Sequence, residues 1–88
     1  MDSKVISYDL MKPGQDYESL YALLKKYQGW AKITESCWFI KTTDSCVKVR
    51  NDLRTVLDGN DRIFVGTLSG EAAWANIICE DEYLKKTI

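Results

Sequence analysis

The chain has 88 residues, a net charge of −1 and a hydrophobic fraction of 45%, with three Trp, five Tyr and two Phe. This length suits one small domain over residues 1–88, which we divide into a core at 4–68 and a C-terminal tail at 69–88. The apolar content excludes a disordered chain, and the charge argues against a strong electrostatic footprint for nucleic acid.

Histidine is absent, and none of the three cysteines, Cys37, Cys46 and Cys79, belongs to a Cys-x-x-Cys pair. A structural zinc site needs four Cys or His ligands, so we expect none, and free thiols of a cytoplasmic protein are the expectation instead. The N-terminus has no long apolar region, so we expect no signal peptide. No apolar stretch reaches the roughly 20 residues that cross a bilayer, so we expect no membrane partner.

The first part of the chain predicts a strand and a helix. Residues 4–9 are rich in β-forming residues and lead into a loop marked by Pro13-Gly14. Asp16 is a candidate helix N-cap and Gly29 a stop signal. Between them, apolar residues recur at helical spacing: Tyr17, Leu20, Tyr21, Leu24 and Tyr27.

The middle of the chain predicts a hairpin, a second helix and a further strand. The hairpin has strands at 30–34 and 37–42, joined by a tight turn. A capping segment that ends at Ser45 precedes an apolar stripe over 46–57, and residues 63–68 predict another strand.

The tail is the least regular part of the pattern. Its apolar segment Trp74–Cys79 predicts a short strand, and Glu80–Lys86 predicts one or two helical turns, because its acids come first and its lysines last.

The order strand, helix, strand, strand, helix, strand is typical of the split βαβ, ferredoxin-like pattern. The fold class we expect is therefore α+β. It has a four-stranded sheet whose first and third strands lie parallel in the middle, two helices on one face and a short C-terminal tail.

Apolar residues alternate onto both faces of this sheet, because Ile6 follows Val5, Phe39 follows Trp38 and Val65 follows Phe64. The face without helices must therefore meet another surface. We expect a second copy of the chain, and the alternative is that the tail folds back over this face. The candidate interface residues are Tyr8, Trp38, Phe64 and Trp74.

Asp9 ends the first strand and is the carboxylate best placed for chemistry. Two such carboxylates, one from each protomer, could hold Mg²⁺ or Mn²⁺ and activate water. The alternative is a turn residue that caps the loop before Pro13. Cys37 has no histidine to activate it, so we expect a structural thiol.

Two short motifs carry a family resemblance. The strand Val5-Ile6-Ser7-Tyr8-Asp9-Leu10 resembles the first strand of the Cas-two family of small CRISPR-associated proteins, and Ser36-Cys37-Trp38-Phe39 is similar to that family's third strand. Ile6–Leu10 with Lys12–Tyr17 resembles short bacterial proteins labelled "SinR family". The resemblance implies a ferredoxin-like homodimer. It also implies that the aspartates matching Asp9 face each other near the dimer axis and hold a divalent metal for phosphodiester cleavage.

The chain departs from the Cas-two pattern where that family usually carries arginines, because Leu10-Met11-Lys12 follow Asp9 here. We therefore expect a non-catalytic or cryptic homodimeric interaction module, whose partner is nucleic acid or another protein. The alternatives are a metal-dependent nuclease that uses paired Asp9 with Mg²⁺ or Mn²⁺, and a toxin-like ribonuclease.

Overall fold

The computed structural model describes residues 1–11 and 17–87, apart from the side chain of Tyr17. The expected loop at Pro13-Gly14 and the expected helix cap Asp16 lie outside these residues. Within the described part, the elements follow in the order β1 (Asp2–Asp9), α1 (Tyr17–Leu24), β2 (Gly29–Thr34), β3 (Cys37–Thr42), α2 (Cys46–Arg54), β4 (Arg62–Thr67) and α3 (Asp81–Thr87).

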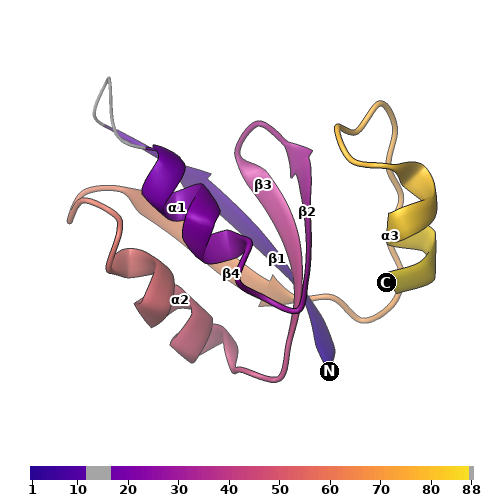
Figure 1. Cartoon of the computed structure of the whole chain (residues 1–88), viewed down its shortest axis with the longest axis horizontal. Helices are drawn as coiled ribbons and strands as arrows, with labels where there is room; N and C mark the ends of the chain where they lie inside the picture. Colours follow the sequence, from indigo (N-terminus) through magenta and orange to yellow (C-terminus); the bar gives the residue numbers. More distant parts are fainter. Residues whose placement is uncertain (12–16, 88) are drawn as a thin grey trace.

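The four strands form one antiparallel sheet in the order β2-β3-β1-β4 (Figure 1). β1 and β3 lie in the middle, as the sequence predicts, but the expectation that they are parallel is wrong. The reason is the chain path. After α1 the chain enters β2 in the same direction as β1, and the hairpin then reverses the direction, so β3 is antiparallel to β1. The protein is thus a small α+β domain whose order βαββαβα roughly resembles the ferredoxin-like pattern.

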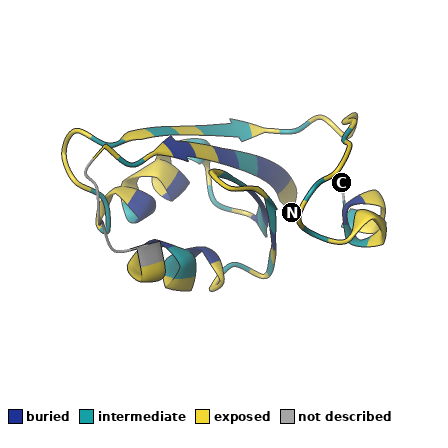
Figure 2. Cartoon of the chain, turned by 90° about the horizontal axis from the view of Figure 1, so that it is seen from above, coloured by how far each residue is buried: buried dark blue, intermediate teal, exposed yellow. Residues whose placement is uncertain are grey.

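Helices α1 and α2 lie together on one face of the sheet (Figure 2). The start of α2 follows from Ser45, whose side chain accepts a hydrogen bond from the backbone N–H of Lys48, so the predicted cap is confirmed. This layer buries the side chains that point from the sheet toward the helices. The buried cluster consists of Ile6, Tyr8, Leu20, Leu24, Trp38, Ile40, Val49 and Leu53.

The tail lies on the other side of the sheet from α1 and α2 (Figure 1). A second apolar cluster forms there around Ala31, Phe39 and Leu84, so the tail does fold back over the second face. The expected helix is confirmed as α3, but the strand expected at Trp74–Cys79 is wrong. That segment is irregular, with Asn76 at a φ of 55°, and it makes one backbone hydrogen bond to the sheet, from Ile78 N to Ile33 O at 2.9 Å.

The three helices have seven to nine residues each. In the described part of the chain, no helix is long and apolar enough to cross a bilayer.

Candidate functional site

The tail covers the second face over β2 and β3 and reaches the start of β1, where the Ser3 hydroxyl donates a hydrogen bond to the Thr87 carbonyl oxygen at 3.3 Å. It leaves a strip over the rest of β1 and over β4. We call this the β1–β4 strip. It consists of three cross-strand pairs: Val5 with Gly66, Ser7 with Phe64, and Asp9 with Arg62. Their side chains point away from the helices, because they alternate along β1 with the buried Ile6 and Tyr8.

Phe64 is the large apolar side chain of the β1–β4 strip, and it is 62% exposed. Its ring lies over Gly66, where a Cβ would sit only 3.2 Å from a ring carbon of Phe64. The missing side chain of Gly66 therefore lets the ring lie along β4. The ring of Phe64 is therefore the main apolar surface that the β1–β4 strip presents to solvent.

Asp9 lies at the end of the β1–β4 strip, and its side chain is 66% exposed. The strand end that carries it is therefore open to solvent. One guanidinium nitrogen of Arg62 lies 4.0 Å from its carboxylate, and the Arg62 side chain is 72% exposed. Together with Ser7 and Phe64, these two residues line a shallow hollow of about 170 Å³. A solvated ion pair of this kind contributes little stability, about 0–1 kcal/mol.

The surroundings of Asp9 do not form a metal centre. Within residues 1–11 and 17–87, no three side chains among His, Cys, Asp and Glu come together as metal ligands would. Mg²⁺ and Mn²⁺ take six oxygen ligands, and an adjacent arginine cation opposes their binding. A metal at Asp9 would depend on ligands from outside residues 1–11 and 17–87.

Two of the four expected interface residues lie inside the molecule. Tyr8 and Trp38 are 2% and 1% exposed beneath the helices, where Trp38 Nε1 donates a hydrogen bond to the Tyr8 hydroxyl at 3.1 Å. Their side chains have almost no surface to offer a partner. Trp74 is half-buried in the tail and donates a hydrogen bond to Asp81. Of the four, Phe64 alone is both exposed and part of the β1–β4 strip.

Cys37 lies next to the β1–β4 strip, opposite Ser7 on β1. Burial raises the pKa of its thiol, so the group stays protonated at neutral pH. A protonated thiol is a weak nucleophile, which agrees with the structural role that the sequence predicts.

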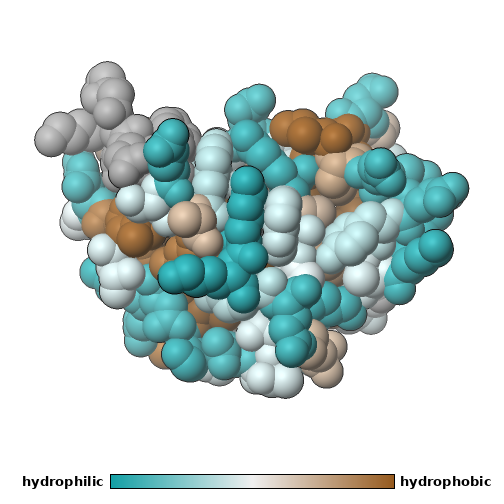
Figure 3. Space-filling model, viewed as in Figure 1, coloured by the Kyte–Doolittle hydropathy of each residue, from teal (hydrophilic) through white to brown (hydrophobic). Residues whose placement is uncertain are grey.

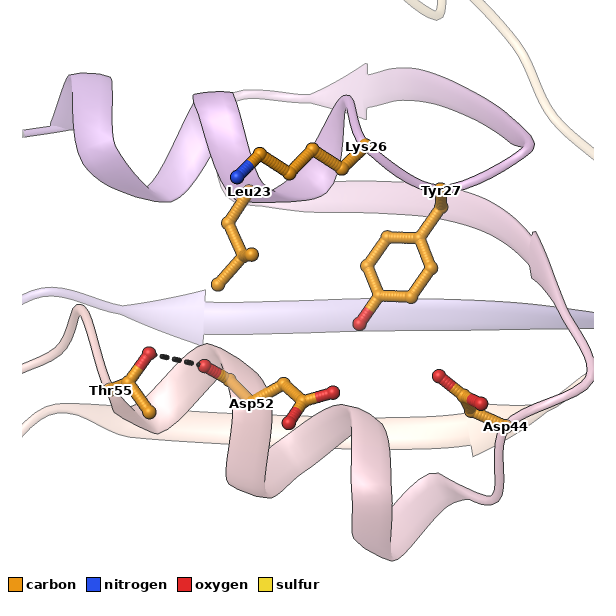
Figure 4. Close-up of a pocket in the computed structure, with 6 residues that line it drawn as sticks. All are labelled: Leu23, Lys26, Tyr27, Asp44, Asp52 and Thr55. Carbon is orange, nitrogen blue, oxygen red and sulfur yellow. Dashed lines mark hydrogen bonds between the residues drawn. The ribbon is translucent and has the colours of Figure 1, made fainter.

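A groove of about 390 Å³ between the α1 and α2 segments was not foreseen from the sequence (Figure 4). The Tyr27 hydroxyl points toward the side chains of Asp52 and Asp44 there. Burial raises the pKa of Tyr27, and the two nearby carboxylates raise it further, so the phenol remains a hydrogen-bond donor. Lys48 Nζ already pairs with Asp52 at 2.9 Å. The apolar spacing of Tyr27 predicted a core residue and gave no sign of this polar environment.

No protein-family model matches the chain, and no match to it is found among curated proteins or solved structures. The resemblance to the Cas-two and SinR families therefore stays a prediction.

Proposed function

We propose that the protein is a non-catalytic interaction module that forms a homodimer through the β1–β4 strip, with a ferredoxin-like core similar to that of Cas-two proteins. The observation that carries this proposal is the 62% exposure of Phe64 in the middle of the strip. Burying one such side chain stabilises a protein contact by roughly 1.5–3 kcal/mol. A domain of 88 residues has little stability to spare, so a second surface is valuable to it.

A second copy suits the charges at the end of the strip. Asp9 and Arg62 stand side by side, and both are mostly exposed. In a two-fold symmetric contact, if Asp9 of one copy contacts Arg62 of the other, then Arg62 of the first copy contacts Asp9 of the second. An adjacent acid and base can therefore form two reciprocal ion pairs across the axis, whereas a single charge would meet its like.

The same pair argues against the metal-dependent nuclease. Two copies of Asp9 near a dimer axis would bring two copies of Arg62 with them, and these cations would occupy the carboxylates that a metal needs. A net charge of −1 also attracts a phosphate backbone poorly. Neither the paired-Asp9 nuclease nor the toxin-like ribonuclease gains support from the site.

The experiment that tests this function combines a mass with an activity assay. Light scattering at micromolar concentration should give about 20 kDa, twice the chain mass of 10.1 kDa. The same sample should not cleave single-stranded RNA or duplex DNA with Mg²⁺, Mn²⁺ or EDTA. Metal-dependent cleavage that is lost in Asp9→Asn would overturn the non-catalytic role, and a clean monomer mass would overturn the dimer.

A further inference from the structure

The outer edge of β2 offers unused backbone hydrogen bonds. The bond from Tyr8 N to Ser36 O, at 3.0 Å, fixes which residues of β3 bond to β1. Because bonding alternates along an antiparallel strand, Phe39 must bond toward β2, where Ala31 lies opposite. The residues on either side of Ala31, Trp30 and Lys32, then direct their N–H and C=O groups away from the sheet.

These outward groups have no partner among the described residues. Farther along the same edge, the carbonyl oxygen of Ile33 also points outward, and it accepts a hydrogen bond from Ile78 N. The tail thus pairs with the edge of β2 at one position and then turns into α3. The edge beside Trp30 and Lys32 is left as a template for an added strand.

A groove of about 390 Å³ runs along this edge, between β2 and the tail. Trp30, Ile78 and Tyr83 give it apolar walls, and Trp30 and Ile78 are exposed. Figure 3 shows an apolar patch over this part of the molecule, between β2 and the tail loop. The groove therefore offers side-chain contacts next to the open backbone groups.

The two sides of this edge differ in charge. On the helix side, Lys25 Nζ lies 5.3 Å from the Trp30 ring centroid, and Lys32 Nζ lies 4.9 Å from that of Tyr21. The Glu35 carboxylate lies 3.7 Å from Lys32 Nζ and offsets part of this positive charge, so the two lysines leave the side net positive. On the tail side, the groove is lined by Ile78, Cys79 and Tyr83 together with Glu80, so this side suits apolar side chains and repels acidic ones. Successive side chains of an added strand would face these two sides in turn. The matching segment alternates acidic and apolar residues.

We infer that the edge of β2 binds an extended segment of a partner protein, with alternating acidic and apolar side chains, as an added strand. This inference rests on the proposed role as an interaction module and names the partner, but it does not need the homodimer. A second copy is a poor occupant, because antiparallel pairing of two β2 edges would bring Lys25 and Lys32 close to their copies.

The probe is an acetylated and amidated peptide, Glu-Val-Glu-Val-Glu-Val, titrated into the ¹⁵N-labelled full chain and followed by NMR. We expect the largest shifts at the amides of Trp30 and Lys32. Two N-methylated versions give a matched control, because in a strand added antiparallel to β2, like every other pair in this sheet, the Glu amides face β2 and the Val amides face solvent. Methylation of the Glu amides should abolish binding, and methylation of the Val amides should preserve it. Equal effects of the two methylations would overturn the inference, and so would the absence of shifts at about 1 mM peptide.

A pair of protein variants isolates one hydrogen bond. Lys32→Ala removes the ammonium group, and Lys32→Pro removes in addition the outward N–H, which makes no bond to β3. Lys32→Pro should bind the peptide about tenfold more weakly than Lys32→Ala. Equal affinities would contradict the inference. If Lys32→Pro does not fold, the methylated peptides still test backbone pairing at the edge of β2, because they are used with the wild-type protein.

The two proposals fail in different ways. Phe64→Ser should remove the dimer and leave peptide binding unchanged, because Phe64 lies on β4 at the opposite edge of the sheet. Peptide binding lost together with the dimer would overturn an independent edge site. Protection of the Trp30 and Lys32 amides that rises with protein concentration, in the absence of peptide, would identify a second copy as the occupant and overturn the inference.

Discussion

Phe39 and Phe64 make a direct comparison between the two halves of the second sheet face. Both point away from α1 and α2, and both lie beside β1, Phe39 across from Val5 and Phe64 across from Ser7. Phe39 is 0% exposed and Phe64 is 62% exposed. The difference comes from the tail, which packs Leu84 and Tyr83 against Phe39 and does not reach Phe64.

Alternation along a strand identifies an apolar face without identifying what covers that face. A single sheet face can be buried at one end and exposed to solvent at the other. In this chain, the boundary between the buried part and the exposed part of the face lies where the tail stops covering the sheet, between Phe39 and Phe64.

Removing the tail after Ser69 should have the largest effect. The deletion exposes Phe39 and Ala31 and removes the buried Leu84, so a large part of the second cluster is lost. We expect precipitation, or a large fall in the melting temperature measured by circular dichroism. An unchanged melting curve would show that the tail does not form part of the core.

Phe39→Ala and Phe64→Ala should differ in how much they destabilise the protein, because Phe39 lies in the covered half of the second sheet face and Phe64 in the exposed half. Phe39→Ala opens a cavity under the tail and should lower the free energy of unfolding by about 3–5 kcal/mol. Phe64→Ala should change it by no more than about 0.5 kcal/mol when both proteins are compared at a dilution at which light scattering gives the mass of one chain. Urea unfolding measures both, and equal losses would contradict the assignment of Phe64 to the surface.

The smallest expected effect concerns the contact within the tail. Trp74 donates a hydrogen bond to Asp81, and Lys85 lies 3.1 Å from the same carboxylate, so both lower the pKa of Asp81. Because this pKa is lower in the folded than in the unfolded state, the stabilisation is present above the unfolded value of about 3.9 and is lost as pH falls through the folded value.

Asp81→Asn tests this pH dependence. Wild type should be more stable than Asp81→Asn at neutral pH, and the difference should disappear in acid, below the lowered pKa of Asp81. Chemical unfolding of the two proteins across the pH range measures the difference. A gap that does not change with pH would mean that the Asp81 carboxylate makes no charged contact with Trp74 and Lys85.

Local patterns predicted much of this fold. The helical stripe, the hairpin and the Ser45 cap depend on residues that are close in sequence, and each is present. The strand at Trp74–Cys79 failed because its apolar side chains serve packing against β2 and β3 rather than pairing. Local pattern also did not predict the burial of Lys4 in β1. Its burial depends on a residue distant in sequence, because Lys4 Nζ donates a hydrogen bond to the Thr67 hydroxyl at 2.9 Å.

The candidate site was harder to predict than the fold. Phe64 was placed on the correct face, but Tyr8 and Trp38 were assigned to an interface and lie in the core, because aromatic residues suit both environments. Asp9 was identified as the carboxylate that ends the first strand, but the Arg62 beside it comes from β4, more than fifty residues later. The open edge of β2 depends on where the tail stops pairing, which no local pattern contains.

The mass of Phe64→Ser tests the central claim most directly. Val47→Ser is the matched control, because Val47 is 56% exposed on α2, in the opposite layer. Light scattering on wild type, Phe64→Ser and Val47→Ser at the same micromolar concentration should give about 20, 10 and 20 kDa, from a chain mass of 10.1 kDa. A wild-type monomer, or a dimer that survives in Phe64→Ser, would contradict a contact through the β1–β4 strip.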